Sequence, residues 1–97
     1  MSEIAFAIRK LDDLITLAVD AETDFEKAAV FGAASALLAF VEAEAEEKFT
    51  QALENVERLR GSLGAIVGYE LTNNHDSARH ASWARAAVIA LQGYMCE

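Results

Sequence analysis

Fourteen consecutive residues, from Ala28 to Val41, carry no charge in a chain whose net charge is −8. Helical spacing places Val30 and Leu37 on one side of this run, and it places small residues on the other: Ala28, Gly32, Ala36, Ala39 and Ala43. A helix that is apolar all round is normally buried, and the run is shorter than the about 20 residues of a membrane span. It therefore predicts the central helix of a bundle, a seam between two copies of the chain, or both.

The composition limits the chain to one small helical domain. Its 97 residues support a single core, and 20 alanines with no proline favour helices. One cysteine excludes an internal disulfide. The excess of acids weighs against direct contact with nucleic acid or with an anionic membrane. Because Glu3 precedes the bases Arg9 and Lys10, the start is unlike a secretory signal, and we expect a cytoplasmic protein.

Four helices are expected, over residues 3–19, 24–47, 49–71 and 78–95. Thr23 followed by Glu26 is a capping-box pattern that starts the second helix, and Asp76 or Ser77 can cap the last one. No glycine or proline marks the junction near residue 48, so one continuous helix from residue 24 to Arg60 is an alternative. We predict an all-α three- to four-helix bundle completed by homodimerisation, with a complete four-helix monomer as the alternative.

The sequence predicts no catalytic residue, no cofactor and no metal site. His75 and His80 are five residues apart, which turns them about 140° from each other on a helix. Cysteine or histidine pairs with the spacing of a zinc site are absent from the sequence. A small helical enzyme that uses His75, Asp76 and His80 is retained as an alternative.

We expect a non-enzymatic module that binds and inhibits or adapts a protein partner, as bacterial or phage inhibitors, immunity proteins and chaperones do. The negative charge would steer the chain to a basic partner. The expected partner-binding residues are acids of the middle segment and an aromatic and basic group near the C-terminus: Glu42, Glu44, Glu46, Glu47, Arg79, His80, Trp83 and Tyr94. A second hypothesis is that the four glutamates mimic a nucleic-acid backbone and so inhibit a DNA- or RNA-binding protein.

A separate apolar set is expected to mediate self-association. The first helix is predicted to bury an apolar stripe made of Ile4, Ile8, Leu11, Ile15 and Ala18. The self-association set combines residues that lie off this stripe with residues of the uncharged run: Phe6, Leu17, Phe31, Gly32, Ala36, Ala39 and Phe40. Phe6 and Leu17 are eleven residues apart, so their side chains leave the helix in nearly the same direction, away from the stripe. These residues predict that a second copy covers part of the first half of the chain.

From Phe49 onward the pattern is an amphipathic helix, a polar turn, the segment Ser77–Ala84 (SARHASWA) and an alanine-rich closing helix. This half of the chain resembles small uncharacterised helical-hairpin proteins of pseudomonads. The resemblance implies a helical hairpin and carries no functional residues over to this sequence.

Overall fold

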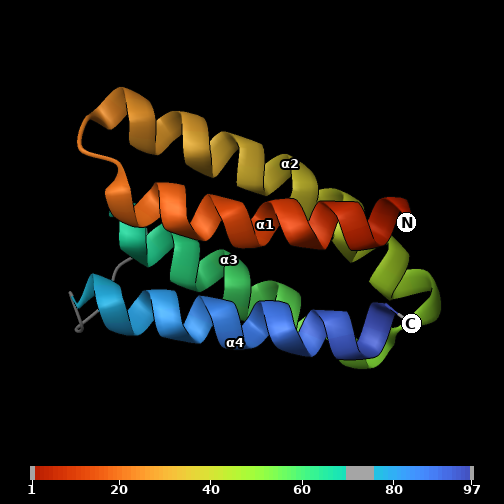
Figure 1. Cartoon of the computed structure of the whole chain (residues 1–97). Coiled ribbons are helices and arrows are strands. Elements are labelled where there is room, and N and C mark those ends of the chain that lie inside the picture. Colours follow the sequence, from red (N-terminus) through yellow and green to blue (C-terminus); the bar gives the residue numbers. More distant parts are fainter. Residues whose placement is uncertain (1, 70–75, 97) are drawn as a thin grey trace.

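The computed structural model describes residues 2–69 and 76–96, which form a bundle of four α-helices (Figure 1). The helices are α1 (Glu3–Asp20), α2 (Asp24–Lys48), α3 (Leu53–Val67) and α4 (Ser77–Met95), and a 3₁₀ turn at Thr50–Ala52 links α2 to α3. Successive helices run in opposite directions, so both chain ends lie at the same end of the bundle (Figure 1). The predicted all-α architecture is confirmed for these residues.

Side-chain caps explain where three of the helices begin. The Ser2 hydroxyl accepts a hydrogen bond from the Ala5 amide at 3.1 Å and starts α1. Thr23 and Glu26 exchange hydrogen bonds between side chain and backbone, which forms the expected capping box of α2. The Thr23 hydroxyl also bonds the Glu26 carboxylate, and these bonds lower the pKa of Glu26. The Asp76 carboxylate caps α4, which decides between the two caps that the sequence offered, Asp76 and Ser77.

The junction between α2 and α3 is a real break. Helix α2 ends at Lys48, and Phe49 adopts a non-helical conformation with φ of −139° before the 3₁₀ turn. The alternative of one continuous helix to Arg60 is therefore wrong. Without glycine or proline, the break has no strong local signal in the sequence.

Helix α3 is shorter than predicted at both ends. It starts at Leu53 rather than residue 49, and it ends at Val67, where Gly68 takes the left-handed conformation with φ of 86°. The amides of Gly68 and Tyr69 bond back to carbonyls of the last turn, which is a common way to end a helix. Gly61 and Gly64 stay inside the helix.

The core contains one apolar stripe from each helix. The expected stripe of α1 is confirmed, because Ile8, Leu11 and Ile15 have no exposed surface.

Two polar links hold neighbouring helices outside the core. Arg60 of α3 bonds Glu42 of α2 at 3.2 Å, and Arg85 of α4 bonds both Asp12 and Thr16 of α1.

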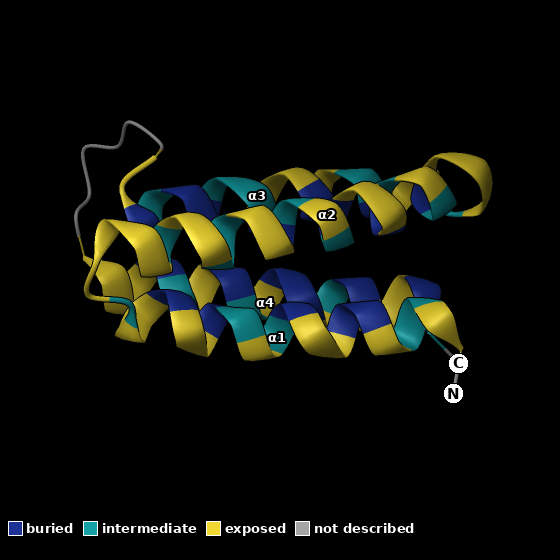
Figure 2. Cartoon of the chain, turned by 90° about the horizontal axis from the view of Figure 1, so that it is seen from above, coloured by how far each residue is buried: buried dark blue, intermediate teal, exposed yellow. Residues whose placement is uncertain are grey.

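Helix α2 differs most from expectation. Its buried residues are Ala34, Leu38, Val41 and Ala45, which form a single stripe. The opposite side, which includes the small residues of the uncharged run, is exposed along most of the helix (Figure 2). Within one chain α2 is therefore not the central helix of the bundle, which was one of the two interpretations of the uncharged run, because α1 and α3 flank it and no described residue covers its outer side.

Candidate protein-binding groove

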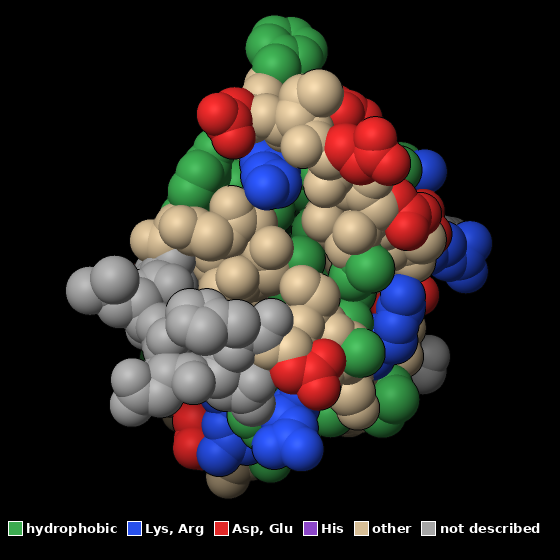
Figure 3. All heavy atoms as spheres, turned by 90° about the vertical axis from the view of Figure 1, so that its left-hand side faces the viewer, with side chains coloured by type: hydrophobic (Ala, Val, Ile, Leu, Met, Phe, Trp, Pro, Cys, Tyr) green, Lys and Arg blue, Asp and Glu red, His purple; other side chains and the backbone are tan. Residues whose placement is uncertain are grey.

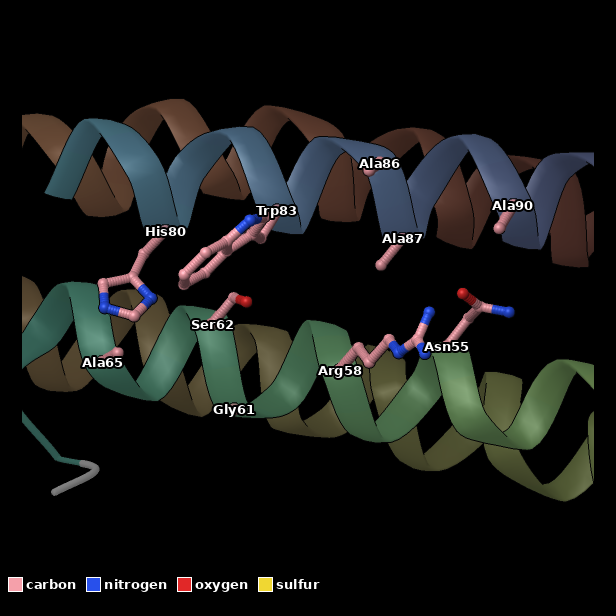
Figure 4. Close-up of a pocket in the computed structure, with 10 residues that line it drawn as sticks. All are labelled: Asn55, Arg58, Gly61, Ser62, Ala65, His80, Trp83, Ala86, Ala87 and Ala90. Carbon is pink, nitrogen blue, oxygen red and sulfur yellow. The ribbon is translucent and has the colours of Figure 1, made fainter. Parts of the chain in front are cut away.

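A groove runs along the outer side of the α3 and α4 pair (Figure 4). Its volume is about 620 Å³, and it lies between the helices that are adjacent in sequence at the C-terminal half of the chain. We call it the α3–α4 groove and define it by its lining: Asn55, Arg58, Gly61, Ser62, Ala65, His80, Trp83, Ala86, Ala87 and Ala90.

The buried polar side chains of the described residues all line this groove. They are Asn55, Ser62 and His80, each at most 9% exposed. Buried polar groups are uncommon in a small apolar core because each must find hydrogen-bond partners. None of the fully buried side-chain nitrogen or oxygen atoms in the described residues lacks a partner. Ser62 and His80 lie toward the Trp83 end of the groove and Asn55 toward the other end (Figure 4), so the polar lining is spread along its length.

Trp83 forms the large aromatic wall of the groove. Half of its surface is exposed, and its ring meets the imidazole of His80 edge to face, with centroids 5.2 Å apart. Both side chains extend from α4 toward α3, and Ser62 faces the indole from the other side (Figure 4). His80 is buried, so the half-exposed indole packs against a neighbour that is itself part of the bundle interior.

The groove floor consists of small residues. Gly61, Ser62 and Ala65 line it from α3, and three alanines line it from α4. A Cβ atom built at Gly61 would meet nothing within 4 Å, so the space above this residue is open. Helix axes pack 8–10 Å apart, and the shorter distances need small residues at the contact. The floor can therefore accept another helix at close range.

Among the described residues, few charged side chains lie at the groove rim. Arg58 pairs with Glu54 at 2.6 Å, and Arg79 is exposed about one turn before Trp83. Asn55, Arg58, Ser62 and Ala65 follow one another at spacings of three, four and three, which places them on one side of α3. Sequence reasoning missed this row, although its spacing was the available signal.

The predicted partner-binding residues do not form one site. His80 and Trp83 line the groove and Arg79 lies beside them, but Tyr94 borders a separate hollow with Phe49 and Ser2. The four glutamates lie on the last turns of α2, at the opposite end of the bundle from the start of α4 (Figure 1).

The glutamates also do not present a uniform row of unpaired carboxylates. Glu42 bonds Arg60, and Glu44 pairs with Lys48 at 3.0 Å, which raises the pKa of Lys48. Partial burial acts to lower the pKa of Arg60, but hydrogen bonds with Glu57 and Glu42 outweigh it and raise that pKa. Glu46 and Glu47 remain exposed. Half of the proposed phosphate mimic is therefore engaged within the chain.

Six of the seven predicted self-association residues are exposed. Phe6 and Leu17 are each about half exposed on α1, and Gly32, Ala36, Ala39 and Phe40 are exposed on α2. Phe31 does not belong with them. It packs against the core, and its ring meets Tyr69 edge to face at 5.1 Å.

A search of the described residues for histidine, cysteine and carboxylate side chains that could hold a metal ion found no such group. His75, which the enzyme alternative requires, lies outside the described residues. By length and composition α2 could cross a membrane, a property that core helices of soluble proteins and signal sequences share. Comparison of the chain with protein-family models, with curated proteins and with solved structures gave no match.

Proposed function

We propose that this chain is a non-enzymatic protein-interaction module that binds a helix of a partner protein in the α3–α4 groove. One observation carries the proposal: the buried polar side chains, the half-exposed Trp83 and a floor of small residues all meet in this groove. Tryptophan is among the residues that most often dominate binding energy at interfaces. Trp83 already packs against His80 in the unbound chain, and a side chain that is partly ordered before binding costs less to immobilise.

The shape of the groove favours a helix as the bound element. The lining spans Asn55 to Ala65 on α3, which is a length of about 15 Å and nearly three helical turns. An amphipathic partner helix could place its apolar side on the alanines and Trp83. Ser62 and Asn55 would then accept or donate hydrogen bonds to polar groups at its edge.

The net charge favours a basic partner. Sixteen acids against eight bases create a negative field that speeds the approach of a positive protein. The groove itself has few charges, so its contacts would supply affinity while the rest of the surface supplies steering. Such a module would act by occluding the partner helix or by linking it to another protein.

The proposal includes association of two copies of the chain. Helix α1 packs against both α2 and α4, and α3 also packs against both of these helices (Figure 1). The outer sides of α1 and α2 therefore face away from the α3–α4 groove. A dimer formed through the outer side of α2 would therefore leave both grooves open.

Affinity capture with the tagged chain tests the groove. A genuine partner should be retained by the wild type and lost with Trp83→Ala, with an affinity decrease of roughly 30-fold or more. Ala86→Glu should have a similar effect because it places a charge in the groove. Ala78→Glu is the matched control, since Ala78 is exposed on α4 but does not line the groove. If the same proteins bind all variants equally well, the groove is not the binding site.

A further inference from the structure

The outer side of α2 forms an apolar face. Phe6 and Leu17 of α1 border it, and an exposed Lys10–Asp13 pair lies between them on α1, with the Lys10 ammonium over the Phe6 ring. Large exposed side chains lie at Phe25 and Phe40 of α2 and at Phe6 and Leu17 of α1. Between them α2 exposes small residues: Ala29, Gly32, Ala33, Ala36, Ala39 and Ala43. We call these ten residues the α1–α2 face. Leu17, Phe25 and Ala29 line one hollow of about 240 Å³, so the two helices share this surface.

The area of this face is close to what a dimer requires. Phe25 is 82% exposed, and Phe6, Leu17 and Phe40 are 52%, 53% and 42% exposed. At about 200 Å² for a large side chain, these four expose roughly 450 Å². A standard interface buries about 800 Å² on each partner, and the six exposed small residues between the large ones supply most of the remainder. The four large side chains alone fall within the about 300–600 Å² of the largest apolar patch on a typical monomer, so it is the exposed small residues that make this face larger than usual.

Charge determines how two copies could meet on this face. Three acids lie between residues 22 and 26 and four between residues 42 and 47, so both ends of α2 are negative while its middle is uncharged. Figure 3 shows acidic side chains gathered at the end of the bundle that carries the α1–α2 turn. Two α2 helices aligned along their whole length would bring these acids together in either direction.

A crossed arrangement avoids this repulsion. Gly32 and Ala36 lie near the middle of the uncharged run, and nothing lies within 4 Å of a Cβ built at Gly32. Small residues let two helices cross closely at an angle of about 50°. Counted from the midpoint between Gly32 and Ala36, Asp24 is about 15 Å away and Glu42 about 12 Å away along the helix, so at that angle the charged ends of the two helices would separate by roughly 10–13 Å. This exceeds the screening length of about 8 Å at physiological salt.

We infer that a second copy of this chain covers the α1–α2 face, with the two α2 helices crossing near Gly32 and Ala36. This inference rests on the proposed self-association and gives it a location and a geometry. The hollow beside Leu17 and Phe25, which Asp20 and Glu26 also line, lies about two and a half helical turns from the crossing and is open to a side chain of the other copy. Because α3 and α4 form the other side of the bundle, partner binding in the α3–α4 groove is independent of this seam.

Sedimentation equilibrium of the whole chain tests the seam. The wild type should sediment at twice its 10.5 kDa mass at high protein concentration. Ala36→Glu should weaken the dimer at least tenfold because it places two carboxylates at the crossing point. Circular dichroism should show an unchanged helix content, since Ala36 is exposed. Ala86→Glu is the matched control, because it makes the same substitution on the opposite side and should leave the dimer intact.

Salt provides a second readout. Since both copies are acidic and the α2 contact is apolar, raising salt from 50 to 500 mM should tighten the dimer, whereas an ion-paired interface would weaken.

A wild type that stays at 10.5 kDa in all conditions overturns the inference. So does equal disruption by Ala36→Glu and Ala86→Glu. Flotation of the wild type with phosphatidylcholine vesicles, abolished by Ala36→Glu, would assign the face to a membrane instead. If only Ala36→Glu fails to dimerise while it still captures the groove partner, the result supports the dimer seam and shows that it is independent of binding in the α3–α4 groove.

Discussion

Replacing Gly61 or Gly68 by alanine should change the free energy of unfolding in opposite directions, although one glycine lies within α3 and the other ends it. Gly68 ends α3 with φ of 86°, whereas Gly61 lies inside α3 with ordinary helical geometry. A Cβ built at either position meets nothing within 4 Å. Neither substitution therefore creates a clash, and the backbone conformation alone determines the sign of the effect.

The expected magnitudes follow from this difference. Alanine in the left-handed conformation costs about 1–2 kcal/mol, so Gly68→Ala should lower the free energy of unfolding by that amount. Alanine in a helix interior is more stable than glycine by about 1 kcal/mol, so Gly61→Ala should raise it. The two variants should then differ by about 2–3 kcal/mol, although each adds a single methyl group.

Urea unfolding followed by circular dichroism measures both variants. With a slope of about 1–2 kcal/mol per molar urea for a chain of this size, the two midpoints should lie at least about 1 M apart on opposite sides of the wild type. The unfolding slopes should stay unchanged. If both variants move in the same direction, α3 does not end at Gly68 as described, and the boundaries of the groove would need revision.

Further substitutions test the capping and the core. Thr23→Ala should cost about 1 kcal/mol in urea unfolding, because it removes the cap of α2. The pKa of Glu26 in the folded chain lies below its ordinary value of 4.5. Its contribution to stability is therefore complete above pH 4.5 and is lost as the pH falls through the lower folded-state pKa. Glu26→Gln should remove this part of the acid dependence when the free energy of unfolding is measured from pH 6 to pH 2. Leu59→Ala should cost about 2–5 kcal/mol because Leu59 is fully buried, whereas Leu17→Ala at an exposed site should cost less than about 0.5 kcal/mol at concentrations where the chain is monomeric. Equal thermal shifts for the two leucine variants would contradict the assigned core.

Periodicity and capping made much of the fold predictable. The spacing of apolar residues correctly identified the inward stripe of α1, and the Thr23 and Glu26 pair identified the start of α2. Helix α2 was harder to interpret because alanine is compatible with either a buried or an exposed position. An uncharged run therefore does not reveal which of its sides faces the core. The partial burial of Phe31 and the exposure of Phe40 depend on where α1 and α3 pack, which is tertiary information.

The candidate site was only partly predictable. Trp83 and His80 were identified as interface residues by type, but their α3 neighbours were missed. The spacing of Asn55 and Ser62 places them on one side of α3, but the sequence does not show that α4 packs beside that side. Grouping Glu42 with Trp83 was not supported, because charge and aromatic content say nothing about which end of a bundle a residue occupies.

Photo-crosslinking from single positions on α4 tests the proposed function most directly. A photoreactive residue at Ala90, which lines the α3–α4 groove, should yield a covalent adduct of one defined mass in cells that contain the partner. The same residue at Ala78, which is exposed outside the groove, should yield none. Adducts of equal yield from both positions, or none from Ala90 while the partner is still captured, would show that the partner binds elsewhere.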